Sequence, residues 1–421
     1  MFPFKLRKPK SKTVRFLWAT CIAIGLFLLS AYAPFALQTT SAQSGLQPIA
    51  PPEQIRGVWL TNVASGIFFV PWGIKRSLQQ LAQLNFNTIY PVVWNRGYTL
   101  YPSAIAAPLT GKKQMPWLGL MHLGQDVLAQ TINQAHQYGL RVLPWFEYGF
   151  IVPTVSQIAQ QHPEWLTHTL AESQQQQGNR HVQAALVAAD FPEAVDQPLI
   201  PQSWLNPFHP QVQEFMLNLI LEVVNNYDID GIQFDDHFSL PVAYGYDSYT
   251  IELYQQEHQG QLPPEDASDE QWVSWRSQKI SEFMQRIATA VREVKPELII
   301  SLSPNSYNFA YKYHLQDWLT WVESGWVDEL ILQVYRSDLA SFSAELGQSA
   351  LQTARQRIPV AIGILTGTLG KPIAIEQVQQ QVQTVQDLQF NGISFFYWET
   401  MWGYFTPESP YQRREGFAQL F

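Results

Sequence analysis

The sequence contains almost no cysteine. Cys21 is the only one among 421 residues, and it lies inside an apolar run near the start of the chain. A single thiol cannot form an intrachain disulfide, and the residues after that run offer no thiol as a nucleophile or metal ligand. Disulfide scaffolds and cysteine-dependent enzymes are therefore excluded.

Positive charge is also scarce. The chain has 26 Lys and Arg against 35 Asp and Glu, which gives a formal net charge of -9 at pH 7. A protein that binds nucleic acid through its phosphates needs a basic surface, so the composition predicts no nucleic-acid partner. Apolar residues make up 46% of the chain, which is ample for a large buried core.

One long run without charge spans residues 16–36, and it follows six basic residues, Lys5, Arg7, Lys8, Lys10, Lys12 and Arg15. This order is typical of an export signal. At roughly 20 residues the run is also long enough to act as an uncleaved membrane tether. We expect a signal peptide or signal-anchor over residues 1–37, a linker rich in Ser, Thr, Gln and Pro over 38–54, and export to the periplasm or cell envelope.

From residue 55 onward, short β-branched or aromatic runs alternate with amphipathic helical patterns. The predicted strands are residues 55–61, 88–94, 141–148, 231–236, 299–305, 329–336, 360–366 and 392–400. The predicted helices are residues 74–84, 125–138, 210–226, 270–294, 314–324, 341–357, 373–388 and 412–420. Eight βα units in series, with no second block of different texture, predict a single (β/α)8 barrel, also called a TIM barrel, over residues 55–421.

Two long segments, 149–206 and 237–269, follow the third and fourth predicted strands. Because barrel enzymes carry their sites on the loops that follow strands, we expect these two to wall a groove. No Gly-x-Gly-x-x-Gly motif follows the first predicted strand, which argues against a dinucleotide-binding sheet.

Acidic residues lie at the carboxyl ends of three predicted strands, where barrel enzymes place their catalytic groups. They are Glu147, Asp235, Asp236 and Glu399. Side chains alternate along a strand, so Asp235 shares a face with Gln233 and is expected to point into the barrel mouth. Glycosidic bond cleavage needs one carboxylic acid and a second carboxylate, and repulsion between adjacent acids would raise the pKa of one of them.

The structural alternative is that these acids pair with Arg96 or Arg336, or cap a helix. Aromatic and polar side chains at the same strand ends are candidate sugar contacts. We expect these contacts from Trp59, Trp94, Asn95, Arg96, Trp145, His237, Asn305, Gln333, Tyr335 and Trp398. Tryptophan is also ordinary core material, so packing in the core is the alternative for each tryptophan.

Asp235, Asp236 and His237 form a run of possible metal ligands. A zinc site needs three protein ligands that converge on one point, and three consecutive residues are not expected to do so. The conceivable distant partners are His162, His168 and His209. We therefore predict a site without a metal or an organic cofactor.

One block of sequence resembles a known family. Trp-Leu-Asn-Pro at residues 204–207, His-Pro at 209–210 and Tyr-Asp-Ile-Asp-Gly-Ile-Gln-Phe-Asp-Asp at 227–236 are similar to the signature of the glycosyl-hydrolase-like family ten. Shorter similar pieces lie at residues 56–61, 162–165 and 333–336. The resemblance covers nearly everything from Arg56 onward. It implies a bacterial envelope barrel that resembles glycosidases, with cell-wall glycan as the substrate.

Residues 230–235 are also similar to the fourth-strand motif of amylase-type barrels, whose final Asp is the nucleophile, which implies that role for Asp235. Gln233 replaces an Arg common in that motif, and the amylase proton donor has no better match here than Asn305. Glu147 stands where family ten typically has Asn. The donor is therefore not carried over, and Asp236 is favoured because it follows Asp235, with Glu147 and Glu399 as alternatives.

The sequence thus predicts a hydrolase that cleaves O-glycosidic bonds of an envelope polysaccharide, such as peptidoglycan glycan strands, with carboxylates alone. Two alternatives stay open. One is a sugar-binding barrel that has lost catalysis, and the other is a scaffold protein that binds partners through its long loops. The separation of two carboxyls across a pocket distinguishes the hydrolase from the sugar-binding barrel. A loop surface without a deep pocket would favour the scaffold protein.

Overall fold

The computed structural model describes residues 52–63, 65–70, 72–178, 201–368, 371–402 and 406–421. The predicted signal segment and residues 38–51 of the predicted linker lie outside these ranges. In the part of the chain that the structure describes, no helix combines the length and the apolar character needed to cross a bilayer.

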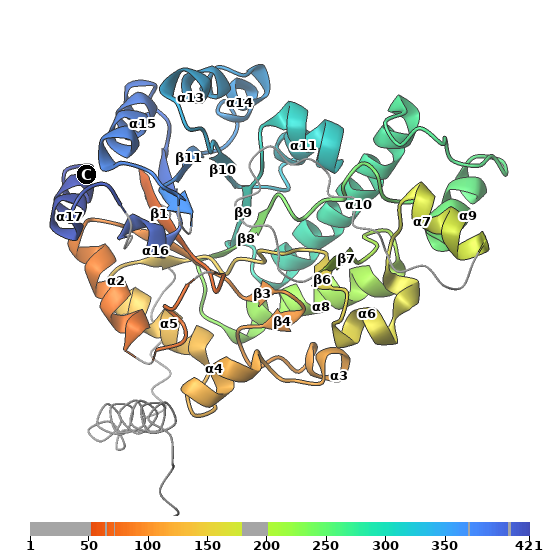
Figure 1. The fold of residues 1–421 in the computed structure, drawn as a ribbon, viewed down its shortest axis with the longest axis horizontal. Helices are drawn as coiled ribbons and strands as arrows, with labels where there is room; N and C mark the ends of the chain where they lie inside the picture. Colours follow the sequence, from red (N-terminus) through yellow and green to blue (C-terminus); the bar gives the residue numbers. More distant parts are fainter. Residues whose placement is uncertain (1–51, 64, 71, 179–200, 369–370, 403–405) are drawn as a thin grey trace, which may run out of the picture. The chain divides into compact units, whose positions relative to one another are not determined.

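The centre of the fold is a sheet of eight parallel strands, surrounded by helices (Figure 1). In spatial order the strands are β5 (Arg141–Val142), β2 (Thr88–Pro91), β1 (Ile55–Leu60), β14 (Gly392–Phe396), β11 (Val360–Leu365), β10 (Glu329–Gln333), β9 (Ile299–Ser303) and β8 (Gly231–Asp235). Every neighbouring pair is parallel. Each strand follows its neighbour in chain order except at β1 and β14, where the last strand meets the first, as a barrel requires.

The gap between β5 and β8 is bridged by Trp145. The Gln233 N–H donates to the Pro144 carbonyl and the Phe146 N–H donates to the Gln233 carbonyl, both at 2.9 Å. Pro144 has no N–H to donate, which explains why the third strand shrinks to two residues plus an isolated bridge. The sheet is thus nearly closed, and the predicted (β/α)8 barrel is confirmed.

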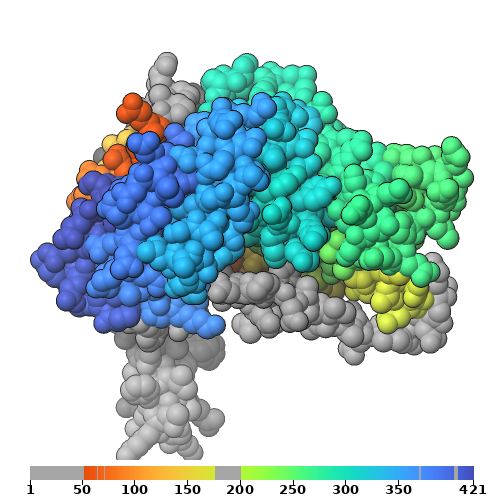
Figure 2. Space-filling view, turned by 90° about the horizontal axis from the view of Figure 1, so that it is seen from above, coloured from red at the N-terminus to blue at the C-terminus, as the bar shows by residue number. Residues whose placement is uncertain are grey.

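Most of the outer helices pack against a neighbouring helix around the sheet, and Figure 2 shows the segments of the second half of the chain side by side. They are α2 (Gly73–Gln83), α5 (Val127–Gln137), α8 (Pro210–Asn226), α10 (Glu270–Val294), α12 (Trp318–Glu323), α13 (Leu339–Leu346), α14 (Ser349–Ala354), α15 (Ile375–Asp387) and α17 (Pro410–Ala418). The predicted helix at 314–324 is wrong as one element. A separate helix, α11 (Tyr307–His314), ends at Leu315, whose φ of +54° breaks the helical path before α12.

The three longest loops at the carboxyl ends of the strands each carry extra elements. The loop after β5 holds β6 (Ile151–Pro153), α6 (Gln157–Gln161), a 3-10 turn (Pro163–Trp165), α7 (Leu170–Gly178) and β7 (Gln202–Trp204). The loop after β8 holds α9 (Ser248–Glu257). Sequence reasoning missed the third excursion, after β2, which contains β3 (Trp94–Asn95), β4 (Tyr98–Thr99), α3 (Ala107–Thr110) and α4 (Pro116–Met121).

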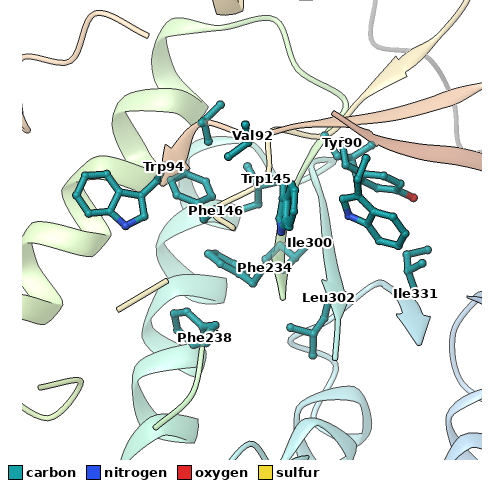
Figure 3. Packing of buried hydrophobic residues seen from close by; sticks show 14 of the residues in the cluster. Tyr90, Val92, Trp94, Trp145, Phe146, Phe234, Phe238, Ile300, Leu302 and Ile331 are labelled. Atoms are coloured by element: carbon teal, nitrogen blue, oxygen red, sulfur yellow. The ribbon is translucent and has the colours of Figure 1, made fainter. Parts of the chain in front are cut away.

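The two faces of β8 show how the barrel is filled. Phe234 faces outward and stacks on Phe146, with ring centroids 5.7 Å apart, under the surrounding helices (Figure 3). Gln233 faces inward, accepts a hydrogen bond from Trp59 Nε1 at 2.6 Å and donates to Ser301 Oγ at 3.0 Å. The predicted alternation along this strand is therefore confirmed.

Candidate active site

The acidic residues at the tip of β8 occupy different environments. Asp235 points inward, and its side chain is only 2% exposed. Its Oδ2 accepts a hydrogen bond from Trp145 Nε1 at 3.1 Å, and its Oδ1 accepts one from the His237 N–H at 2.9 Å. Both oxygens of Asp235 are thus engaged by the protein itself.

Asp236 is the more accessible of the pair, with its side chain 21% exposed. Asn305 Nδ2 donates to its Oδ2 at 2.9 Å, and Gln333 Nε2 donates to its Oδ1 at 3.1 Å. Asn305 follows β9 and Gln333 ends β10, so two neighbouring strands fix this carboxylate at the barrel mouth. The structure therefore brings together Asp236, Asn305 and Gln333, all three predicted from strand ends.

Glu147 lies behind these residues, buried at 5% exposure. Thr61 Oγ1 donates to its two oxygens at 3.0 and 3.1 Å, and Asn95 Nδ2 donates to Oε2. Asn95 also donates to Asn62 Oδ1 at 2.8 Å. The ends of β1 and of the β3–β4 hairpin thus hold this acid, although Thr61 and Asn62 were not among the predicted site residues. Their position at the end of the first strand was the signal.

His237 links the three acids. Its Nδ1 lies 2.9 Å from the Glu147 carbonyl oxygen, 3.4 Å from Asp235 Oδ2 and 3.7 Å from Asp236 Oδ1. A carbonyl can only accept a hydrogen bond, so Nδ1 carries a proton. The His237 side chain is 34% exposed, so part of the ring reaches solvent.

Burial and mutual charge set the protonation of the cluster. Burial and the charge of Asp235 raise the pKa of Glu147 to about 8. Burial raises the pKa of Asp235 to about 6, against the opposing effect of His237. Burial by itself lowers the pKa of His237, but the charges of Asp236 and Asp235 outweigh it and raise this pKa to about 10. Near neutral pH the cluster therefore holds an imidazolium and a protonated Glu147.

Glu399 has a different setting from the prediction. It lies in a short helix, α16 (Trp398–Met401), because the eighth strand ends at Phe396. Its Oε1 accepts hydrogen bonds from Ser65 Oγ and from the N–H groups of Gly66 and Ile67 at 3.1 and 3.2 Å. Burial raises the pKa of Glu399 to about 7. Through these hydrogen bonds Glu399 stabilises the loop after β1.

The predictions of Trp59 and Trp94 as sugar contacts are wrong, because both side chains are buried in the core. Trp94 is fully buried, packs on Phe215 of α8 and donates Nε1–H to the Gly149 carbonyl at 2.9 Å. Figure 3 shows it beside a helix and well apart from Trp145. Trp59 is 1% exposed and packs inside the barrel beside Tyr90 and Trp145, with its Nε1–H bonded to Gln233. Both rings are thus buried in the core.

Of the remaining predicted aromatic contacts, Trp145 and Tyr335 lie near the acids. Trp145 is buried but reaches Asp235 through its N–H. Tyr335 is partly exposed and stacks on Phe396 with ring centroids 5.5 Å apart. Trp398 is 9% exposed and packs against Trp402 at 5.3 Å, which leaves little of its ring for a ligand.

Two further polar groups of the site were not among the predicted site residues. Gln316, between α11 and α12, donates to the Asp235 and Phe238 carbonyls at 2.9 and 3.1 Å and so fixes the turn after β8. Tyr148 stacks on the His237 ring at 5.3 Å with an interplanar angle of 9°. Gln316 lies at no predicted strand end, whereas Tyr148 is the last residue of the predicted third strand and was not chosen as a site residue.

The expectation that residues 235–237 cannot converge is also wrong. One ligand atom from each of the three lies within 4.8 Å of the others. The reason is the turn after Asp235, which folds His237 back toward the strand end. Two carboxylates and one imidazole could thus reach one cation, although protein donors already occupy the carboxylate oxygens described above.

Sequence comparison gives a family. The family described as "Glycosyl hydrolase-like 10" matches residues 54–386. The glycosyl hydrolase DigH of Escherichia coli strain K12 is 25% identical over 407 residues, which cover 85% of this chain and 84% of DigH. The glycosyl hydrolase YngK of Bacillus subtilis is 21% identical over 374 residues, covering 77% of this chain and 59% of YngK.

Solved structures share the fold. The glycoside hydrolase domain of PgaB (BpsB) from Bordetella bronchiseptica has a TM-score of 0.58 at 13% identity, covering 82% of this chain and 94% of that domain. Alpha-L-fucosidase isoenzyme 2 from Paenibacillus thiaminolyticus has a TM-score of 0.56 at 16% identity, covering 87% of this chain and 48% of the fucosidase. With the family match spanning most of its barrel, the chain belongs to the glycosyl hydrolase-like 10 family.

Proposed function

We propose that this chain is an exported glycoside hydrolase of the cell envelope that cleaves O-glycosidic bonds in a polysaccharide, with peptidoglycan glycan strands as the substrate class. The observation that carries the proposal is Asp236. It reaches solvent at the barrel mouth while Asn305 and Gln333 fix its two oxygens. A fixed, accessible carboxylate beside a second acid is what glycosidic bond cleavage requires.

In this mechanism Asp236 acts directly on the glycosidic bond, because it is the most accessible acid of the cluster. Asp235 supplies the second carboxyl. Its pKa of about 6 lets it hold or release a proton near neutral pH, as general acid–base work needs. Glu147 is the third acid of the cluster. Because it stays protonated near neutral pH, it adds no negative charge beside Asp235 and Asp236. The scheme uses no metal or organic cofactor.

The sugar-binding alternative has an observation of its own. Both oxygens of Asp235 and both of Glu147 accept hydrogen bonds from the protein. Acids engaged in this way can serve only to shape the mouth, leaving Asp236 as a sugar contact. Binding without turnover would then be the whole function.

The test is the release of reducing ends by the full chain from a panel of polysaccharides, with peptidoglycan strands and soluble glucans as its two arms. We expect release from peptidoglycan strands and its loss in Asp236→Asn. The matched control is Asp228→Asn, which removes an exposed carboxylate at the opposite end of the same strand motif. Release of reducing ends from none of the polysaccharides, together with retained binding, would favour the sugar-binding barrel.

A further inference from the structure

Arg96 occupies an unusual place beside the site. It sits at the tip of the β3–β4 hairpin, whose strands pair Trp94 with Thr99 and Asn95 with Tyr98. Arg96 has a φ of +52° and Gly97 a φ of +74°, the left-handed pair of a two-residue hairpin turn. Asn, Asp or Gly usually takes the first of these positions, because other side chains are strained there. A strained arginine next to a site points to a use for its side chain.

The guanidinium of Arg96 has no acidic partner among the residues that the structure describes. Six other arginines there lie within ion-pair distance of a carboxylate, namely Arg141, Arg286, Arg292, Arg336, Arg357 and Arg413. Five more described arginines share with Arg96 the lack of such a partner, namely Arg56, Arg76, Arg276, Arg355 and Arg414. Arg96 instead lies over the ring of Tyr148, with its guanidinium carbon 5.9 Å from the ring centroid. It is half-buried, so its donors remain within reach of a ligand.

The neighbours of Arg96 place it on the wall of the mouth. Tyr148, which it overlies, follows Glu147 and stacks on His237 at 5.3 Å. The two centroid distances together put the guanidinium carbon within about 11 Å of the His237 ring. The turn also packs on the β6 loop, since the Cβ position of Gly97 is 3.6 Å from Pro153 and from Ser156. Arg96 and the imidazolium of His237 are therefore two cations that both contact the Tyr148 ring.

The barrel carries a net negative charge, so the positive charges of Arg96 and His237 bear on which saccharides the site accepts. Six of the 26 Lys and Arg residues precede residue 16, whereas the first of the 35 Asp and Glu is Glu53, so the barrel is more acidic than the whole chain. A negatively charged saccharide that approaches Asp235 and Asp236 is repelled unless cations compensate. A neutral saccharide would not need a guanidinium without an acidic partner at that place.

We propose that Arg96, supported by His237, is the subsite for a carboxylate carried by the sugar chain, and that it selects acidic over neutral glycans. This inference rests on the proposed glycosidase function and adds the class of substrate to it. The guanidinium forks onto the two carboxylate oxygens, a geometry that lysine cannot reproduce. The Tyr148 ring contacts the guanidinium of Arg96, so the guanidinium N–H donors are oriented before the ligand binds.

The test uses one glycan in two charge states. Peptidoglycan strands stripped of peptides by an amidase carry free lactyl carboxylates, and carbodiimide coupling with methylamine makes the same strands neutral. We expect the wild-type full chain to prefer the acidic strands. Arg96→Gln should lower kcat/KM on acidic strands by roughly 10- to 100-fold, the value of one charge-assisted hydrogen-bonded contact. On neutral strands it should change kcat/KM by no more than about twofold, as loss of an exposed charge does.

Two comparisons make the outcome specific. Arg96→Lys keeps the charge and loses the fork, so its loss on acidic strands should lie between wild type and Arg96→Gln. Arg286→Gln removes an exposed positive charge from the outer face of α10 and should leave the preference unchanged. An equal loss on both strands in Arg96→Gln would show that Arg96 only positions the hairpin, and equal use of both strands by wild type would also overturn the proposal.

Failure of the glycosidase function is separable from failure of this subsite. Equilibrium binding of the two strand preparations to Asp236→Asn measures charge preference without turnover. A preference for acidic strands that disappears in the double variant with Arg96→Gln supports the subsite even if no strand is cleaved. Equal binding of acidic and neutral strands overturns it even if cleavage occurs.

Discussion

Replacing Glu147 by Gln should change how the stability of the fold depends on pH. The folded state raises the pKa of Glu147 from 4.5 to about 8, through burial and the charge of Asp235. The folded protein therefore keeps this proton over a pH range in which the unfolded chain releases it. The stability that this group contributes is fully present below pH 4.5 and is lost as the pH rises to about 8.

The magnitude follows from the size of that rise. At about 1.4 kcal/mol for each tenfold change in proton affinity, the loss amounts to at most about 5 kcal/mol. Glutamine is uncharged at every pH and close in shape to the protonated acid. Glu147→Gln should therefore match wild type in acid and become progressively more stable than wild type as the pH rises.

The assay is urea unfolding of both proteins at a series of pH values across this range. Glu257→Gln is the control with the opposite sign, because the Lys279 and Trp275 hydrogen bonds overcome the effect of burial and lower the pKa of Glu257. Its contribution is present at neutral pH and is lost as the pH falls through the lowered pKa. A stability difference between Glu147→Gln and wild type that stays flat with pH would refute the reasoning on Glu147.

Three further predictions concern the site and the sheet. Gln333→Leu removes a donor to Asp236 and should lower kcat by about tenfold, measured at saturating polysaccharide, with little change in the melting temperature. EDTA should leave activity intact, and complete loss that a divalent ion restores would assign a cation to residues 235–237. Gly392→Ala should cost about 2 kcal/mol or more in urea unfolding, because the added Cβ would lie 2.1 Å from the Ile55 carbonyl oxygen; a variant as stable as wild type would show that this approach relaxes freely.

The sequence was most informative where the two-residue alternation of side chains determines which face of a strand each residue occupies. Alternation along β8 correctly separated Gln233 and Asp235, which face inward, from Phe234, which packs under helices. The strand ends also predicted Asn305 and Gln333, which meet at Asp236. These successes are physical, because the carboxyl ends of barrel strands converge whatever the loops do.

Sequence reasoning was less informative where backbone geometry changes at one residue. Pro144 interrupts the third strand, and the chain after Phe396 turns into helix α16, which carries Glu399 to the loop after β1. Trp94 ends the predicted second strand but belongs to the hairpin, where its ring is buried in the core. A periodic pattern contains no information about such turns.

Electrostatic roles were the least predictable part of the site. Adjacency of Asp235 and Asp236 correctly indicated one perturbed acid, yet the main cause of the raised pKa of Asp235 is burial, and its neighbour contributes less. The pairing of His237 with the Glu147 carbonyl and the stacking of Tyr148 depend on loops that pack only in three dimensions. Burial and partner identity therefore had to come from the structure.

If Asp236 at the barrel mouth cleaves a glycosidic bond with water, an oxygen atom from the solvent enters each new reducing end. Mass spectrometry of peptidoglycan strands detects this oxygen after incubation with the full chain in water enriched in heavy oxygen. We expect new reducing ends that each carry one heavy oxygen atom with wild type, and none with Asp236→Asn although the strands still bind. Undiminished incorporation by Asp236→Asn, or binding by wild type without any incorporation, would contradict this expectation.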